Sequence, residues 1–284
     1  MSVARGLRFK QVDVFTRVPF RGNPVAVVLE AEGLDAAAMQ RIAGWTNLSE
    51  TTFVLPPSTG AADYRLRIFT PRAELPFAGH PTIGSAHAVL EGGIAKANNG
   101  ILRQECGAGI LSLEVDGDTL WLGSPEATDT QVAESDIALL ERVLGRKAEP
   151  VPLVMNVGPR WLIVELANAS AVASLAPDMA AITELSNRLE IGGITVYGAS
   201  GEADAAIHVR SFAPAHGIPE DPVCGSGNIS VAAYLRRSGR FGAGYVARQG
   251  LQLGRDGRVS IRFDGDRILL GGSAVTCIEG TLRA

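Results

Sequence analysis

The chain carries two copies of one sequence pattern, and this internal repeat limits its possible folds more than any other feature. An Arg-x-Phe-x-Pro segment, a glycine-led loop and a segment with an internal Asp-Gly-Asp occur twice in the same order. The matched segments are 67–71 with 210–214, 79–84 with 225–230, and 112–123 with 260–271. The offsets grow slightly along the chain, as duplication followed by small loop insertions would produce. We therefore predict two similar halves, 1–127 and 128–272, with 128–135 as a polar linker.

Each half is expected to curl several strands around one central helix. Hairpins are predicted at 9–29 and again at 151–166, where apolar and polar residues alternate on either side of a turn. The segment 81–92 has small residues on every side, apolar residues between them and no charged face, and 227–234 is similar. Helices without a charged face are usually buried on all sides. Strands outnumber helices and Asp-Gly-Asp turns recur, so the expected class is α+β rather than a doubly wound parallel sheet.

Composition narrows the kind of partner. The 284 residues are 46% hydrophobic and carry a net charge of −4 without a Lys/Arg run, which argues against a nucleic-acid surface. No apolar stretch approaches the roughly 18 residues that a membrane span needs. The N-terminus lacks a signal core, and three cysteines without metal spacing suit a reducing cytoplasm. We expect a cytoplasmic protein that acts on a small molecule and binds neither nucleic acid nor membrane.

The stretch 220–228 is the most distinctive local sequence. Pro222 disfavours helical dihedral angles at the preceding residue, and the Gly, Ser and Asn that follow suit a turn into a helix beginning near Gly225. The N–H groups of a first helical turn lack partners, so such an end attracts a carboxylate or a thiolate. Its repeat copy begins at Gly79. A cleft between the two halves is the expected place for a substrate.

Four side chains are candidates for chemistry. Glu50 precedes a core strand, so desolvation would make it a base or acid near neutral pH, unless it is an ordinary polar strand end. His80 can relay a proton, or it can be a loop imidazole satisfied by the backbone. Asp221 can hold a substrate amine or orient His80, or simply cap a turn. Cys224 lies at a helix N-terminus, where a thiol can have a lowered pKa and act as a base or nucleophile.

The repeat also shows where the halves differ. Ala78 stands at the place of Cys224, which argues against two opposed thiols, and Gly193 stands at the place of Glu50, so only one half carries the acid. No Walker loop, zinc spacing or serine-triad signature is present, and Gly107-Ala-Gly109 lacks the third glycine of a dinucleotide fingerprint. We therefore expect neither a metal nor another cofactor.

Four strings in this chain resemble the PhzF-like family of phenazine biosynthesis, within the diaminopimelate epimerase-like superfamily. They are Gly22-Asn-Pro-Val-Ala-Val27, Ser49-Glu-Thr51, Phe77-Ala-Gly-His-Pro-Thr82 and Glu220-Asp-Pro-Val-Cys-Gly-Ser226. The resemblance covers nearly the whole chain in the correct order. It implies two pseudo-symmetric domains, each a barrel-like, mostly antiparallel sheet around a helix, with a last strand at about 273–284 returning to the first half.

The resemblance also implies a function. It implies a cofactor-free isomerase, commonly a homodimer, that moves a proton on a small carboxylate-bearing substrate. Carried over by position, Glu50 is the acid/base, His80 and Asp221 bind and assist, and the helix ends at Gly79 and Gly225 hold the substrate carboxylate. The positions implied to bind substrate are Asn23, Gly79, Gly225, Ser226 and Gly227.

Two departures from the family pattern keep alternatives open. The phenazine enzymes usually have Thr where this chain has Cys224, and Ala-His where it has Gly227-Asn228. Cys224-Gly-Ser-Gly resembles instead a half-site of diaminopimelate and proline epimerases. A two-base racemase or epimerase using Cys224 and Glu50 is therefore one alternative. A metabolite-binding protein without turnover is another.

Overall fold

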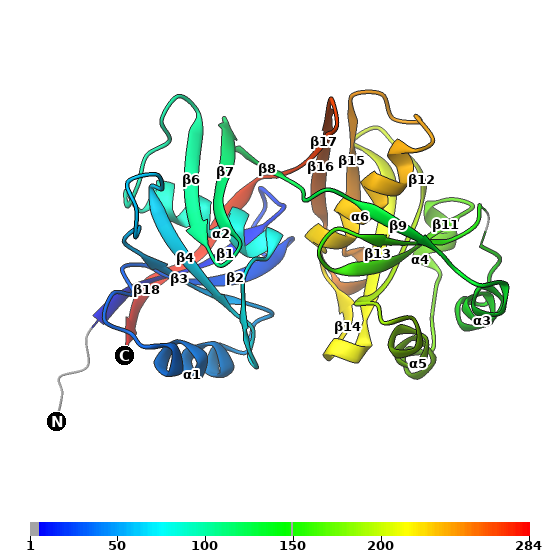
Figure 1. The fold of residues 1–284 in the computed structure, drawn as a ribbon, viewed down its shortest axis with the longest axis horizontal. Coiled ribbons are helices and arrows are strands. Elements are labelled where there is room, and N and C mark those ends of the chain that lie inside the picture. Colours follow the sequence, from blue (N-terminus) through cyan, green and yellow to red (C-terminus); the bar gives the residue numbers. More distant parts are fainter. Residues whose placement is uncertain (1–5, 149) are drawn as a thin grey trace. The chain divides into compact units, whose positions relative to one another are not determined.

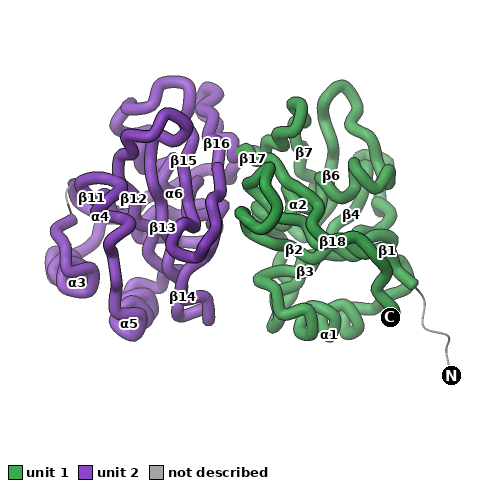
Figure 2. The backbone as a smooth tube through the Cα atoms, turned by 180° about the vertical axis from the view of Figure 1, so that it is seen from behind, with its two compact units in different colours: residues 1–122, 271–284 green, residues 123–270 purple. Residues whose placement is uncertain are grey.

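The computed structural model describes residues 6–148 and 150–284, which fall into two structural units (Figures 1 and 2). Unit 1 comprises Met1–Leu122 and Gly271–Ala284, and unit 2 comprises Gly123–Leu270. Eighteen strands and six α-helices occur among the described residues, so the predicted α+β class is confirmed. None of the described helices combines the length and the apolar character needed to cross a membrane.

Unit 1 is built around the antiparallel pair formed by its first and last strands. Strand β18 (Ala274–Arg283) pairs with β1 (Gly6–Val14), and β1 pairs on its other side with β2 (Asn23–Val28). From β2 the sheet continues in parallel to β3, which pairs antiparallel with β4. The remaining elements of this unit are α1 (Ala36–Thr46), β3 (Thr51–Leu55), β4 (Tyr64–Phe69), β5 (Glu74–Leu75), α2 (Gly79–Glu91), β6 (Ile101–Cys106), β7 (Gly109–Asp116) and β8 (Thr119–Gly123).

Unit 2 repeats this connectivity. Its parallel pair β11–β12 corresponds to β2–β3, and its parallel pair β13–β15 corresponds to β4–β6. Its elements are β9 (Thr128–Gln131), α3 (Glu134–Leu144), β10 (Leu153–Asn156), β11 (Arg160–Leu166), α4 (Ala169–Ala173), α5 (Met179–Leu189), β12 (Gly193–Glu202), β13 (Ala205–Ala213), β14 (Ile218–Asp221), α6 (Gly225–Arg236), β15 (Gly244–Gln249), β16 (Gly257–Asp264) and β17 (Arg267–Gly272).

One helix lies inside each unit, as its composition predicts. Helix α2 contacts β1, β2, β3, β4 and β18, and α6 contacts β10, β11, β12 and β16 (Figure 1). Both helices are buried on successive turns. Helix α2 begins at Gly79, two residues before the predicted start at Pro81. Proline is tolerated there because the first turn's N–H groups have no partners within the helix.

The predicted linker at 128–135 is wrong. Residues Thr128–Gln131 form β9, which pairs antiparallel with β10, and α3 starts at Glu134. All four strand residues are exposed, so this outer strand has no apolar face to reveal it in the sequence. Only its two β-branched threonines favour a strand, and that preference is weak.

A glycine in α2 provides a test of this packing. A Cβ at Gly84 would lie 2.5 Å from Val25 Cγ1 and 2.8 Å from Val14 Cγ2. We expect Gly84→Ala to lower the free energy of unfolding by about 1–3 kcal/mol, because both valines are buried and stiff. Urea unfolding at equilibrium measures this change.

The matched control is Gly44→Ala in α1. Its Cβ would lie 3.5 Å from the nearest atom, Pro71 O, and Gly44 is exposed. That variant should raise the free energy of unfolding by up to about 1 kcal/mol, since Ala favours a helix over Gly. Equal unfolding midpoints for the two variants would contradict the packing argument.

Candidate active site

In unit 1 the structure brings Glu50 and His80 together. Glu50 directly precedes β3, and His80 lies in the first turn of α2. Glu50 Oε2 is 3.4 Å from His80 Nε2, and the two side chains are only 15% and 8% exposed. Because α2 packs on both β2 and β3, the start of the helix lies next to the start of β3. A buried carboxyl group therefore faces a buried imidazole.

The hydrogen bonding of His80 determines which nitrogen faces Glu50. The ring makes a hydrogen bond to the backbone of Pro24, which has no N–H, so the Pro24 carbonyl accepts this bond from an imidazole N–H. Since Nε2 faces Glu50, we assign this donor as Nδ1–H. Burial lowers the pKa of His80 to about 4, and the Pro24 carbonyl offsets this only in part. The neutral ring thus presents the lone pair of Nε2 to Glu50, and the 3.4 Å contact between Nε2 and Oε2 does not meet hydrogen-bond geometry.

Asn23 and Gly79 are the other predicted site residues of unit 1. Asn23 is 1% exposed and begins β2, immediately before the Pro24 carbonyl that holds His80. Gly79 is the first residue of α2, and no side chain caps this helix at Ala78. The N–H groups of the first turn can therefore receive an anion such as a substrate carboxylate.

Unit 2 brings Asp221 and Cys224 together around the start of α6. Asp221 ends β14, and its Oδ1 accepts a hydrogen bond from Val223 N at 3.1 Å. Cys224 is the N-cap residue, and its Sγ accepts from Gly227 N at 3.3 Å. Ser226 Oγ lies 3.6 Å from the same sulfur. The predicted residues Asp221, Cys224, Gly225, Ser226 and Gly227 thus form one cluster.

Burial changes the protonation of this cluster. It raises the pKa of Asp221 to about 6, against the hydrogen bonds from Cys224 and Val223, and the charge of Glu220 raises it further. Burial, followed by the charge of Asp221, raises the pKa of the Cys224 thiol well above its ordinary value. The lowered thiol pKa that the helix N-terminus suggested for Cys224 is therefore contradicted. The hydrogen bond from Gly227 N and the helix N-terminus lower the thiol pKa by less than burial and the Asp221 carboxylate raise it.

Two further residues position this cluster, and the sequence did not single them out as site residues. Gln249, at the end of β15, is fully buried. Its Nε2 donates to Asp221 O at 3.0 Å, and its Oε1 accepts from Cys224 N at 3.2 Å and from Asn228 Nδ2 at 2.7 Å. Asn228 Nδ2 also donates to Cys224 O at 2.9 Å. No motif marks Gln249, because its role depends on a contact with residues 21 to 28 positions away.

A similar support was missed in unit 1. Asp13 on β1 is 2% exposed, and its Oδ2 accepts a hydrogen bond from Gly22 N at 2.9 Å. Gly22 admits no side chain, because a Cβ there would lie 2.0 Å from Val14 O. This contact fixes the turn that leads to Asn23 and Pro24. The sequence signal that could have identified Asp13 was the presence of an acidic residue within a strand of alternating apolar and polar residues.

Metal binding has no evident basis within residues 6–148 and 150–284. No group of three or more His, Cys, Asp or Glu side chains there could hold a metal ion.

The raised pKa of Asp221 predicts how stability depends on pH. The folded protein binds this proton more tightly than the unfolded chain, so the free energy of unfolding falls as pH rises from about 4 to about 6. We expect Asp221→Asn to be more stable than the parent protein at about pH 8, by about 1–2 kcal/mol, and to lose this advantage at about pH 4. The estimate is below the full linkage value because Asp221 is only half-buried.

Chemical denaturation of both proteins at the two pH values measures the difference. Asp116→Asn, at the exposed last residue of β7, controls for general loss of charge. An advantage of Asp221→Asn that stays constant with pH would contradict the assignment.

The raised pKa of Cys224 predicts low reactivity. At about pH 7.5 we expect iodoacetamide to modify the partly exposed Cys106 and Cys277 at least about tenfold faster than Cys224, because only the thiolate reacts. Peptide mapping by mass spectrometry gives the three rates, and the urea-unfolded protein supplies the control in which the rates converge. Preferential labelling of Cys224 in the folded protein would show that a thiolate is present.

Comparison with known proteins places this arrangement in a family. The family model described as phenazine biosynthesis-like protein (PhzC-PhzF) matches residues 12–280. The fission yeast *Schizosaccharomyces pombe* protein named antisense-enhancing sequence 1 is 41% identical, over 96% of this chain and 97% of its own. A *Pseudomonas fluorescens* relative named trans-2,3-dihydro-3-hydroxyanthranilate isomerase is 34% identical, over 95% of this chain and 97% of its own.

A solved structure agrees with the sequence relatives. The *Bacillus anthracis* phenazine biosynthesis protein of the PhzF family superposes with a TM-score of 0.88 at 26% identity, covering 99% of this chain and all of the other. Several relatives are named isomerases, and the chain is an enzyme of the isomerase class. By the extent of the family match and the identity to its members, the chain belongs to the phenazine biosynthesis-like (PhzF) family.

Proposed function

We propose that this protein is a cofactor-independent isomerase that moves a proton between two positions of a small carboxylate-bearing metabolite, with Glu50 as the acid/base. The observation that carries the proposal is the buried Glu50–His80 pair at 3.4 Å. A carboxyl group shielded from water and held against a neutral imidazole is suited to take up and return one proton.

The proposed reaction uses three residues of unit 1, namely Glu50, His80 and Gly79. Ionised Glu50 removes a proton from a carbon of the substrate, and the electron pair of that C–H bond moves into the adjacent unsaturated system. Protonated Glu50 is then stabilised by donating to the lone pair of His80 Nε2. It returns the proton to another carbon of the same molecule, so no atom is gained or lost. The N–H groups at Gly79 bind the substrate carboxylate and stabilise the charge that develops.

Asp221 is proposed to assist the same reaction. With a pKa of about 6 it is mostly ionised at neutral pH, so it can bind an ammonium or hydroxyl group of the substrate. Ser226 and the N–H group of Gly225 lie in the same cluster and supply further donors, whereas the N–H group of Gly227 already donates to Cys224 Sγ. Gly227 must lack a side chain, because a Cβ there would lie 2.7 Å from Ser211 Oγ and 2.8 Å from Thr195 Oγ1.

The first substrate to test follows from the relatives' names. Three *Pseudomonas* relatives, each 34% identical, are named trans-2,3-dihydro-3-hydroxyanthranilate isomerase. An anthranilate carries both a carboxylate and an amine, and these are the two groups that the helix end and Asp221 are suited to bind. Amino and hydroxy acids of similar size form the wider panel.

The two-base epimerase is the weaker alternative. It requires Cys224 to act as a base, whereas burial and Asp221 keep the thiol protonated. Turnover in deuterated water separates the two mechanisms. Rapid incorporation of solvent deuterium at a stereocentre indicates two bases, and retention of the substrate's own proton indicates that Glu50 acts alone.

Glu50→Gln is the decisive variant. It keeps the shape of the side chain and removes the base, so kcat should fall by about 100-fold to 10,000-fold while substrate binding is retained. Proton NMR of the substrate follows turnover, and calorimetry measures binding. Glu126→Gln, an exposed position, should leave both unchanged. Unimpaired turnover by Glu50→Gln would reject Glu50 as the acid/base.

The proposal includes two expectations taken from the sequence. We propose that the enzyme is a homodimer and that it works in the cytoplasm on a small molecule, without nucleic acid or membrane. Sedimentation equilibrium of the purified chain measures the oligomeric state.

A further inference from the structure

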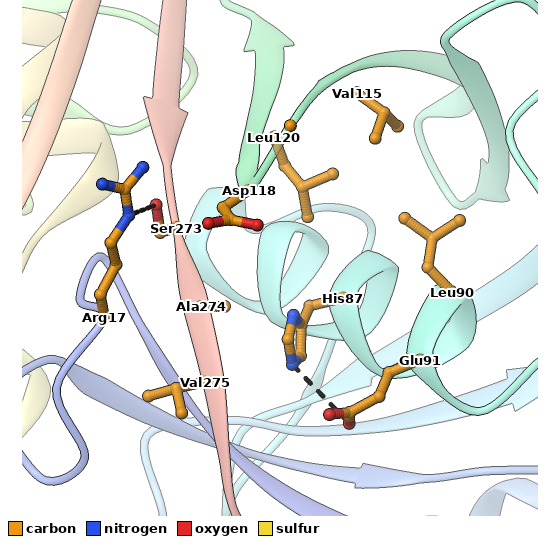
Figure 3. A pocket seen from close by; sticks show the side chains of 11 residues that line it. Arg17, His87, Leu90, Glu91, Val115, Asp118, Leu120, Ser273, Ala274 and Val275 are labelled. Carbon is orange, nitrogen blue, oxygen red and sulfur yellow. Dashed lines mark hydrogen bonds and ion pairs between the residues drawn. The ribbon is translucent and has the colours of Figure 1, made fainter.

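Unit 1 contains a cavity of about 360 Å³ that is lined by neither Glu50 nor His80 (Figure 3). Four parts of the unit line it: the last two turns of α2, the hairpin of β7 and β8, the start of β18, and the segment between β1 and β2 that carries Arg17. Its charged or titratable lining residues are Arg17, His87, Glu91 and Asp118, and its apolar ones include Leu90 and Leu120. The cavity is large enough for a small metabolite, and a mixed lining of this kind suits one.

A hydrogen-bond network fixes the tautomer of His87. Thr276 Oγ1 donates its only proton to Glu91 Oε2 at 2.6 Å, so it must accept from His87 Nε2–H, which lies 3.2 Å away. Burial, as the main cause, lowers the pKa of His87, so the ring is neutral at pH 7. Nδ1 is then an unprotonated acceptor. In Figure 3 it is the ring nitrogen that points away from Glu91, toward Leu120 and Asp118.

Glu91 supports this arrangement through its Oε2 atom. Besides Thr276, it accepts from Lys10 Nζ at 2.5 Å, and the Lys10 side chain is only 3% exposed. Lys10 Nζ also lies 3.4 Å from Glu279 Oε1. A buried, paired lysine keeps Glu91 and Thr276 in place, and through them it holds the imidazole of His87.

The opposite side of the cavity presents two charges. Arg17 Nε donates to Ser273 Oγ at 3.2 Å, which orients the guanidinium group. Among the described residues its Nη atoms have no hydrogen-bond partner, and the Asp118 carboxylate has neither a hydrogen-bond nor an ion-pair partner. Arg17 and Asp118 do not pair with each other, since no ion pair within 4.0 Å joins them in the described chain. One cation and one anion therefore stay available at one cavity.

We propose that this cavity binds a small zwitterion of the amino-acid class. The ligand carboxylate binds the Nη atoms of Arg17, and the ligand ammonium donates to Asp118 and to His87 Nδ1. Its aliphatic part contacts Leu90 and Leu120. The binding site is independent of the proposed proton transfer, although His87 and His80 belong to the same helix.

The first test concerns the free protein. With ¹⁵N-labelled histidine, long-range ¹H–¹⁵N NMR spectra distinguish the two neutral tautomers. We expect His87 to carry its proton on Nε2 at pH 7. A proton on Nδ1 would overturn the proposal, because the ammonium would then meet a donor instead of an acceptor.

The second test is a titration with L-alanine, followed by the His87 imidazole signals. Saturable shifts are expected, and Arg17→Met and Asp118→Asn should each weaken binding by about tenfold or more, since each removes a charge-assisted hydrogen bond. Propionate and ethylamine, which carry one charge each, should bind more weakly by a similar factor. Arg72→Met, at an exposed position away from the cavity, is the matched control and should bind like the parent protein.

Two outcomes of the titration would overturn the proposal. The first is the absence of saturable shifts at His87 with L-alanine up to about 50 mM. The second is unchanged affinity in both Arg17→Met and Asp118→Asn. Shifts confined to His80 would show binding at the candidate active site instead and would also count against it. Glu50→Gln should leave the response of His87 intact, so failure of the proposed isomerase activity leaves this test valid.

Discussion

The candidate active site depends on the close packing of two helices, both rich in small residues, against the strands of their own units. Gly84 in α2 leaves no room for a Cβ beside Val25, and Gly227 in α6 leaves none beside Ser211 and Thr195. Because each helix packs this closely, its N-terminus lies beside strand ends. His80 thereby reaches Glu50, and Cys224 reaches Asp221. Larger helical residues would push the helix away from the sheet and separate these pairs.

The repeated arginines act on the segments that lead to these helices. Arg210 Nε and Nη2 donate to the two carboxylate oxygens of Glu220 at 2.9 and 2.8 Å, and the guanidinium lies 4.9 Å from the ring of Phe212. Arg67 repeats the arrangement with Glu74 and Phe69. The unit 2 pair is only 6% and 8% exposed, and breaking one partner of such a buried pair costs about 3–5 kcal/mol. The residue next to Asp221 is therefore firmly held.

The sequence predicted those parts of the structure that depend on local patterns. The α+β class and both small-residue helices follow from repetition and composition. Cys224 was also predicted beside Asp221, because the two are close in sequence. What depends on distant contacts was not predictable. Gln249 reaches Asp221 and Cys224 only through the packing of β15. The thiol pKa depends on desolvation, which the tertiary structure alone determines.

Duplication gave the two units equivalent helix ends, and single residues then made them chemically different. At the position of Glu50 unit 2 has Gly193, where a Cβ would lie 2.1 Å from Phe212 O, so no acid can replace it there without moving the backbone. Unit 2 instead has a protonated thiol, which is a hydrogen-bond donor and a poor base at neutral pH. Unit 1 has the carboxyl group and no thiol at Ala78. At these matched positions the two units therefore do not carry a symmetric pair of bases, because the carboxyl group occurs in unit 1 and the thiol in unit 2.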